Sequence, residues 1–185
     1  MDRDRRWLVL AERTLVERRW LTIHEQHVRL PNGHEIEEFH LIRGPDWAAV
    51  LALTDDAHAV LVRQYRHGAD RTSLELPAGI IDAGEDGLAA AQRELLEETG
   101  YVADAWHPLA VFSTEPSRHT THAHFFVATG ARAVRDPQTE ASEMLETQRL
   151  PLRELGSSID TGAIAHGLHV AAILLAARKG FLKLE

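Results

Sequence analysis

Three glutamates, Glu94, Glu97 and Glu98, have a spacing that would bring their carboxylates together on a helix. At about 100° per residue they fall within an arc of roughly 100°. Carboxylates this close repel one another, so we expect a cation among them. Because oxygen-only ligands favour hard cations, we expect Mg²⁺, with Mn²⁺ as a substitute, rather than zinc.

The element that must hold these carboxylates is a helix predicted over residues 87–99. Asp86 can cap its start, and Gly100 stands where a helix-terminating glycine belongs. The arc next to the carboxylates is apolar and can pack on a sheet. A solvated acidic face is the usual explanation of a glutamate-rich helix. That explanation does not account for the glycine-rich loop before the helix or for Arg93 beside Glu94.

The segment from Gly79 to Tyr101 resembles the Nudix box, Gly-x5-Glu-x7-Arg-Glu-U-x-Glu-Glu-x-Gly-U, in which U is bulky and apolar. Every specified position is matched, with Tyr101 as the final bulky residue. Fixed gaps between so many positions make this a specific signal, unlike a lone glycine motif. The resemblance implies an α/β/α sandwich and a hydrolase that cleaves a pyrophosphate bond.

The resemblance also implies a role for each matching residue. Metal ligation is implied for Glu94, Glu97, Glu98 and the carbonyl of Ala78, orientation of the glutamates for Arg93, a structural or outer metal role for Glu85, and close backbone approach for Gly79. Metal ions that bridge a pyrophosphate neutralise its charge and lower the pKa of a bound water. A glutamate can then take the proton of that water, so no covalent nucleophile is needed.

Features outside the box resemble the ADP-ribose and nucleoside diphosphate sugar pyrophosphatases. The lead-in Leu74–Gly79 has the form common in that group, and Pro116 stands where the group carries a marker proline. We therefore expect Mg²⁺-dependent hydrolysis of ADP-ribose or a related nucleoside diphosphate sugar to a nucleoside monophosphate and a sugar phosphate. Residues 115–118 read Glu-Pro-Ser-Arg and depart from the Ser-Pro-Gly form of many ADP-ribose enzymes, which leaves other nucleotide sugars open.

In that group the catalytic base often comes from an acidic loop after the box. Glu143 and Glu140 lie in the matching region, and we prefer Glu143 because the residues that follow it resemble the acidic run entering the family's next strand. Glu94 is the box glutamate that could take the proton instead. The candidate substrate contacts are Arg66 as a phosphate clamp, Arg118, Glu75 and Gly79.

Other functions remain as alternatives. Another Nudix pyrophosphatase, acting on GDP-mannose or a dinucleoside polyphosphate, would carry the same box. A non-catalytic ADP-ribose sensor is disfavoured because the box is complete and little chain remains for a DNA-binding module. An RNA 5′-end hydrolase is disfavoured by a formal net charge of −8 and by the lack of a basic stripe.

Length and composition place the chain among soluble globular proteins. Its 185 residues fit one domain with a modest extra lobe, and 44% of them are hydrophobic. The absence of cysteine excludes disulfides, thiolate catalysis and Cys-type zinc sites. No secretory signal or membrane-spanning stretch is present, and the acidic balance disfavours nucleic acid. We expect a cytoplasmic enzyme whose partner is a small nucleotide-sugar substrate.

Hydrophobic patterning predicts an α+β fold with a mixed sheet. Strand-like segments alternate with turns, without regular β-α-β order, and a closing helix is predicted over about residues 160–179, with Gly167 as the candidate position of a break. His166 and His169 are neighbours on that helix, a spacing more typical of a surface or satisfied core pair than of a metal site. We expect residues 1–45 to form an antiparallel β lobe that builds a homodimer, and residues 46–185 to form the Nudix domain.

Overall fold

A computed structural model describes residues 5–139 and 144–184 of the chain. The chain folds into two compact units, which are treated separately below. The first contains the residues up to Pro45 together with Ser113–His122, and the second contains Asp46–Phe112 together with the residues from Ala123 onwards. In the described part of the chain, no helix combines the length and apolar character needed to cross a membrane.

The first unit is a three-stranded antiparallel sheet in the order β1-β2-β3. Its strands are β1 (Leu8–Arg18), β2 (Leu21–Arg29) and β3 (Glu35–Arg43). Pro31-Asn32-Gly33 makes the turn between β2 and β3, with Gly33 at a φ of 85° that favours glycine. The backbone of Ile42 pairs with the later segment, donating to the carbonyl of Arg118 at 2.8 Å.

The second unit is built on a mixed sheet in the order β12-β5-β4-β10-β9, with β6 beside β5 and β7 beside β4. Its strands are β4 (Trp47–Leu53), β5 (His58–Arg66), β6 (Arg71–Glu75), β7 (Ala78–Ile80), β9 (Ala105–Ser113), β10 (His122–Thr129) and β12 (Leu145–Pro151). β4 and β10 run parallel, whereas β4 is antiparallel to β5 and β7. A small ladder joins β8 (Tyr101–Val102) to β11 (Arg132–Ala133).

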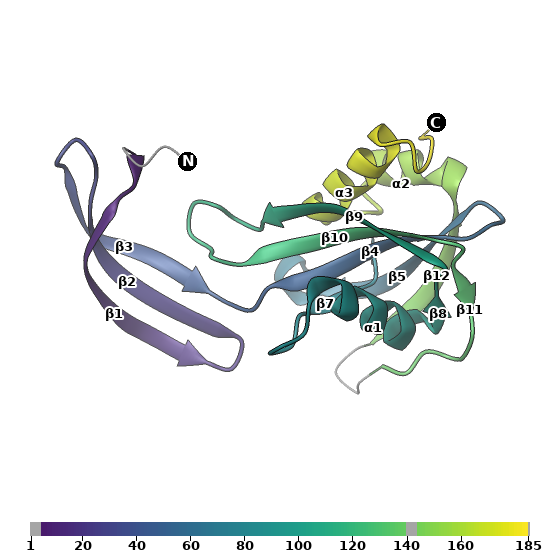
Figure 1. The fold of residues 1–185 in the computed structure, drawn as a ribbon, viewed down its shortest axis with the longest axis horizontal. Helices are drawn as coiled ribbons and strands as arrows, with labels where there is room; N and C mark the ends of the chain where they lie inside the picture. Colours follow the sequence, from purple (N-terminus) through teal and green to yellow (C-terminus); the bar gives the residue numbers. More distant parts are fainter. Residues whose placement is uncertain (1–4, 140–143, 185) are drawn as a thin grey trace. The chain divides into compact units, whose positions relative to one another are not determined.

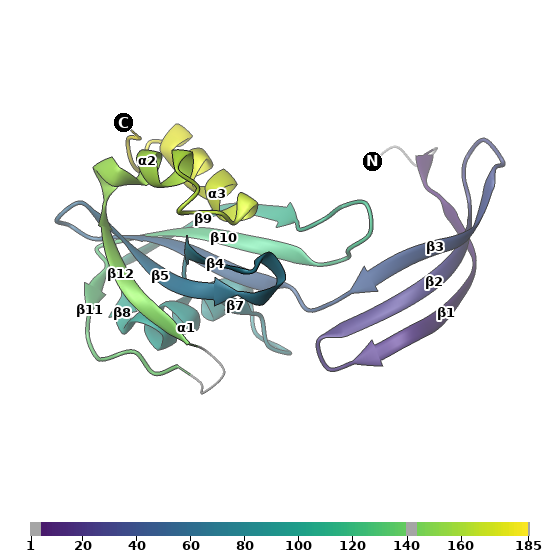
Figure 2. The same ribbon diagram turned by 180° about the vertical axis from the view of Figure 1, so that it is seen from behind.

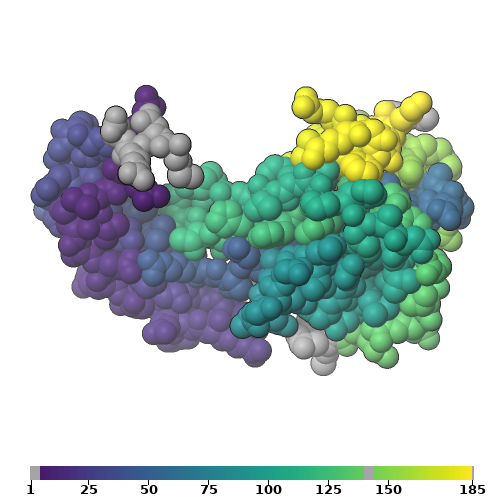
Figure 3. Space-filling view, viewed as in Figure 1, coloured from purple at the N-terminus to yellow at the C-terminus, as the bar shows by residue number. Residues whose placement is uncertain are grey.

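Helices cover both faces of this sheet (Figures 1 and 2). The helices are α1 (Gly87–Thr99) on one face and α2 (Leu155–Asp160) with α3 (Gly167–Arg178) on the other, and one-turn 3-10 helices lie at His67–Ala69 and Leu152–Glu154. In the space-filling view, the yellow C-terminal segment lies directly over the teal and green surface of the same unit (Figure 3).

Successive side chains along a strand point to opposite faces of the sheet, so each strand contributes alternate residues to the two helix layers. In β4, alternate residues 49, 51 and 53 pack with α2 and α3, while residues 48, 50 and 52 pack with α1. This strand is buried on both sides, which explains its continuous apolar run. The predicted α+β fold, with a mixed sheet between helices and a separate N-terminal antiparallel sheet, is therefore confirmed.

The closing helix predicted over residues 160–179 is interrupted, and its continuous part begins at Gly167, the candidate position of the break; the helix predicted before that residue is wrong. α2 already ends at Asp160, and α3 begins only at Gly167. Gly162 adopts a φ of 73° just after α2, and the following segment turns onto β6, where the carbonyl of Ala163 accepts from the amide of Leu74 at 2.9 Å. This pairing with a distant strand holds residues 161–166 in a turn and loop that local helical periodicity could not reveal.

Candidate active site

Helix α1 fixes the direction of the glutamate side chains. The Oδ1 atom of Asp86 accepts from the amide of Ala89 at 2.8 Å, which caps the first turn. Gly100 closes the helix at a φ of 73°, and its amide donates to the carbonyl of Leu96. Because the opposite side of the helix is buried against the sheet, the carboxylates have a defined position relative to β7.

Arg93 is the centre of the carboxylate cluster. Its Nε and Nη2 atoms donate to the two oxygens of Glu85 at 3.1 and 2.9 Å. Its Nη1 atom donates to Glu94 at 2.6 Å and to Glu97 at 3.2 Å, and Nη2 also reaches the carbonyl of Ile80 at 2.9 Å. These bonds raise the pKa of Arg93, and the same guanidinium holds the pKa of Glu85 below its usual value. Arg93 thus contacts three carboxylates of the box directly.

The strand β7 lies directly against two of the glutamates. The amide of Ala78 donates to the Oε2 atom of Glu98 at 2.9 Å. A Cβ atom added at Gly79 would lie 1.9 Å from the Oε1 atom of Glu94, a separation that only glycine permits. Glu94 and Glu98 are both buried, so their carboxylates are held in fixed positions.

The donor set of this cluster suits a hard divalent cation. Glu85, Glu94 and Glu97 surround the single guanidinium of Arg93, and Glu98 accepts from the amide of Ala78, so carboxylates outnumber the cation in this cluster. Within residues 5–139 and 144–184, no three acidic or histidine side chains converge as ligands. The carboxylates are instead bonded to Arg93 and to the amide of Ala78. Their oxygen chemistry fits the ion.

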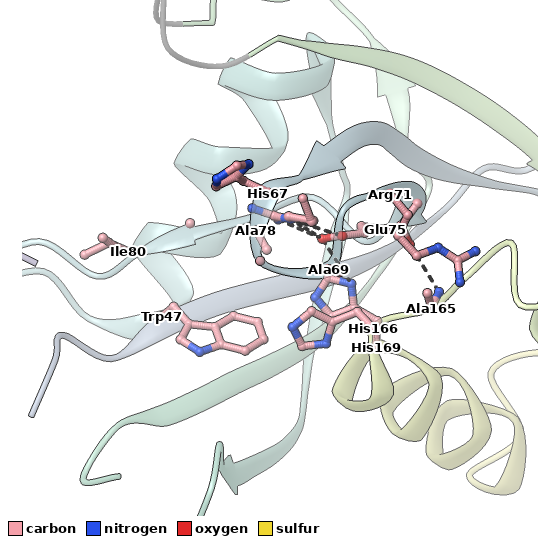
Figure 4. A pocket seen from close by; sticks show the side chains of 14 residues that line it. Trp47, His67, Ala69, Arg71, Glu75, Ala78, Ile80, Ala165, His166 and His169 are labelled. Carbon is pink, nitrogen blue, oxygen red and sulfur yellow. Dashed lines mark hydrogen bonds and ion pairs between the residues drawn. The ribbon is translucent and has the colours of Figure 1, made fainter. Parts of the chain in front are cut away.

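A cavity of about 490 Å³ lies beside β7, and residues of β5, β6 and α3 also line it (Figure 4). This volume falls in the range of small-molecule sites, about 300–1,000 Å³. Its wall combines the backbone of β7 with charged, aromatic and imidazole side chains. The residues that line it are Trp47, Arg66, His67, Gly68, Ala69, Arg71, Ser73, Glu75, Ala78, Gly79, Ile80, Ala165, His166 and His169.

Arg66 and Glu75 form a bidentate ion pair in this wall. Nε of Arg66 donates to both oxygens of Glu75 at 3.1 Å, and Nη2 donates to Oε2 at 2.7 Å. The side chain of Glu75 is only 1% exposed, whereas that of Arg66 is 43% exposed. Hydrogen bonding to Glu75 raises the pKa of Arg66. Glu75 therefore orients Arg66, and the guanidinium is the member of the pair that is open to solvent.

The structure brings some of the other candidate residues together and not others. Arg66, Glu75 and Gly79 share one cavity. Arg118 belongs to the first unit, in the segment that pairs with β3. Glu140 and Glu143 lie outside the described residues.

Two cavity residues, Trp47 and His169, were not expected to take part. The sequence predicted His169 as half of a surface or satisfied core pair rather than as a metal ligand. In the structure the two rings lie 5.8 Å apart in the cavity wall. The spacing of His166 and His169 was visible in the sequence, but the amide of Leu76, which donates to His169, lies 93 positions away along the chain.

Comparison of the chain with known proteins identifies the family to which it belongs. The model of the NUDIX domain matches residues 44–172, and that of the nucleoside diphosphate sugar hydrolase N-terminal domain matches residues 7–42. The CMP-5'-(N-acetyl-N-hydroxy-3-aminopropyl)phosphonate hydrolase of Streptomyces rubellomurinus is 35% identical over 159 residues, covering 85% of this chain and 75% of that protein. The ADP-ribose pyrophosphatase of Bacillus subtilis is 30% identical over 146 residues, covering 78% of each chain.

A solved structure agrees with this assignment. The crystal structure of an ADP compounds hydrolase matches with a TM-score of 0.81 and 25% identity, covering 94% of this chain and 93% of that one. The match includes the N-terminal sheet as well as the sandwich, since so much of both chains is covered. With the complete box on α1 and both family models matched, the chain belongs to the Nudix hydrolase family and carries the N-terminal domain of nucleoside diphosphate sugar hydrolases.

Proposed function

We propose that this enzyme carries out Mg²⁺-dependent hydrolysis of the pyrophosphate bond of ADP-ribose or a related nucleoside diphosphate sugar. The products would be a nucleoside monophosphate and a sugar phosphate. The observation that carries this proposal is the double role of β7, whose residues Ala78, Gly79 and Ile80 line the cavity. The same residues contact the carboxylate cluster through Glu98, Glu94 and Arg93. A diphosphate at the cluster can therefore extend one of its substituents into the cavity.

Each side chain has a task in this scheme. Glu94, Glu97, Glu98 and the carbonyl of Ala78 would hold Mg²⁺, which supplies charge neutralisation and a bound water of lowered pKa. Arg93 holds the glutamates in place through the contacts described above.

Two further groups act on the substrate. Arg66, oriented by Glu75, can bind phosphate oxygens at the cavity. Glu143, or Glu140 in its place, would take the proton of the attacking water as general base. Arg118 is a weaker candidate for a second phosphate contact.

ADP-ribose leads among the substrates because two independent observations favour it. The chain carries the N-terminal domain of nucleoside diphosphate sugar hydrolases, and the relative from Bacillus subtilis is an ADP-ribose pyrophosphatase. The relative from Streptomyces rubellomurinus acts on a CMP-linked phosphonate, which shows that the partner of the nucleotide can vary among similar chains. GDP-mannose and a dinucleoside polyphosphate are therefore the competing substrates.

A substrate panel tests this assignment. ADP-ribose, GDP-mannose and a dinucleoside polyphosphate would each be incubated with the enzyme and saturating Mg²⁺, and the nucleoside monophosphate would be measured by chromatography. We expect the highest kcat/KM with ADP-ribose. A higher kcat/KM with either competitor would move the assignment to that substrate. No release from any of the three would contradict the proposed reaction class for this chain.

We also propose that the first unit forms a homodimer. Along β1, successive residues Leu8, Val9 and Leu10 point to opposite faces of the strand, yet all three are exposed. Trp7 and Trp20 are exposed as well, the latter by 57%. Apolar surface of this kind on a thin sheet marks an interaction site, and a second copy of the chain is the simplest cover.

A further inference from the structure

A two-residue crossover links the phosphate-facing arginine to the glutamate cluster. β6 pairs with β5 as far as Glu75, which lies opposite Val62. β7 pairs with β4 from Ala78, which lies opposite Ala49. Leu76 and Pro77 make the step from one strand partner to the other. The residue before this step orients Arg66, and the residue after it holds Glu98, so the crossover sets the distance between the two parts of the site.

The amide of Leu76 is the group that the crossover leaves without a strand partner. Pro77 has no amide hydrogen, and its carbonyl accepts from the amide of Val50 at 3.1 Å. Leu76 is buried, and a buried amide without an acceptor is strongly disfavoured. The amide donates instead to the Nδ1 atom of His169 at 3.2 Å.

This bond continues a ladder along the outer edge of β6. The amide of Leu74, two residues earlier and therefore on the same edge, donates to the carbonyl of Ala163 at 2.9 Å. The Oγ atom of Ser73, the residue before Leu74, accepts from the amide of Ala165 at 3.1 Å. At the next step of this edge an imidazole on α3 takes the place of a backbone carbonyl.

The surroundings of His169 hold its ring in one state. The side chain is 1% exposed and stacks on His166 with ring centroids 4.2 Å apart and planes inclined by 17° (Figure 4). Burial keeps the pKa of His169 well below its ordinary value, so the imidazole is neutral. Oε2 of Glu75 lies 4.0 Å from the same Nδ1, beyond hydrogen-bond reach. Since Nδ1 accepts from Leu76, the ring hydrogen is on Nε2.

We propose that His169 is a positioning residue for the diphosphate site: by accepting the amide hydrogen of Leu76, it fixes the crossover that places Arg66 relative to the glutamate cluster. This inference rests on the proposed function, in which Arg66 and the cluster contact the same diphosphate. His169 acts through the backbone and needs no contact with the reacting atoms.

The test compares two substitutions that differ in hydrogen bonding at the position of Nδ1. His169→Asn keeps an acceptor at the position of Nδ1, whereas His169→Phe keeps the ring and removes the acceptor. His107→Phe is the matched control, because His107 lies on β9 against Phe181, away from the cavity. If His169→Phe fails to fold, His169→Gln replaces it, since its amide reaches the Nε2 position and not that of Nδ1.

The first readout requires no substrate. Hydrogen exchange of the Leu76 amide, followed by NMR, should accelerate roughly tenfold or more in His169→Phe, the loss expected for one buried hydrogen bond. It should stay near the wild-type rate in His169→Asn and in the control. The Nε signal of Arg66 should shift in His169→Phe alone. Unchanged exchange and an unchanged Arg66 signal in His169→Phe would overturn the proposal.

The second readout is ADP-ribose hydrolysis. We expect kcat to fall by roughly tenfold to a hundredfold in His169→Phe, as for a displacement of about 1 Å in a catalytic site. KM should change less, and His169→Asn should recover most of the activity. Equal losses in both variants would indicate a packing role and contradict the proposal. If the wild type does not hydrolyse ADP-ribose, the proposed function fails, while the exchange and Arg66 signals still decide whether His169 fixes the crossover.

Discussion

Replacement of Gly79 by alanine is the sharpest perturbation that the site offers. The backbone of Gly79 has no positive φ, so alanine is conformationally tolerated and the effect comes from the new methyl group alone. That group would lie 1.9 Å from Oε1, 2.2 Å from Cδ and 2.7 Å from Oε2 of Glu94. The Glu94 carboxylate must therefore retreat by at least about 1 Å to restore an ordinary contact, and it would lose its 2.6 Å bond to Arg93.

The cost of Gly79→Ala follows from this displacement. A shift of about 1 Å in a catalytic constellation can lower the rate by roughly a hundredfold. Overpacking typically costs about 1–3 kcal/mol of stability. Each kcal/mol corresponds to a decrease of roughly 2–4 °C in Tm for a chain of this size.

The assay is kcat for ADP-ribose hydrolysis at saturating Mg²⁺, together with Tm by calorimetry. Gly167→Ala is the control, because a Cβ added at Gly167 meets nothing within 4 Å and the residue lies outside the cavity wall. We expect the control to retain wild-type activity. A Gly79→Ala enzyme with kcat within about threefold of wild type and an unchanged Tm would refute the close packing of β7 on Glu94 and the reasoning built on it.

The remaining predictions concern other parts of the molecule. Glu97→Gln and Glu98→Gln should keep the fold but abolish most turnover, and activity within about threefold of wild type in both at saturating Mg²⁺ would exclude them as metal ligands. Glu143→Gln should lower kcat by roughly a hundredfold to ten-thousandfold with little change in KM, and a loss confined to Glu140→Gln would move the base three residues upstream. Light scattering at micromolar concentration should show a dimer, and a fully active monomer would exclude the proposed role of the first unit. Burial lowers the pKa of His169 in the folded protein, so as pH falls below about 6.5 the imidazole is protonated in the unfolded state before the folded state. Tm should therefore decrease from pH 7 to pH 5, and the decrease should be smaller in His169→Asn. An equal decrease in both proteins would indicate that other groups control it.

The parts of the site that were predictable from sequence are those encoded by short-range spacing. The Asp86 cap, the Gly100 terminus and the shared face of the glutamates all depend on residues within one helix. Arg93 reaches its partners Glu94 and Glu97 on that helix, so its role also follows from the local pattern.

What the sequence did not reveal depends on distant contacts. β6 and β7 are short, and they exist as strands because β5 and β4 pair with them. The hydrogen bond from Leu76 to His169 joins residues 93 positions apart in the chain, and no local periodicity predicts it. Glu75 was expected at the substrate and lines the cavity, but its bidentate ion pair with Arg66 depends on the pairing of β5 with β6, which the sequence does not show.

Hydrolysis of ADP-ribose in ¹⁸O-labelled water tests the central claim most directly. The products would be identified by mass spectrometry after incubation with the wild-type enzyme and Mg²⁺. We predict equal amounts of AMP and ribose 5-phosphate, with one labelled oxygen in the phosphate of one of the two products. Release of ADP and free ribose would show cleavage at a different bond, and the absence of both AMP and ribose 5-phosphate would contradict the account for ADP-ribose.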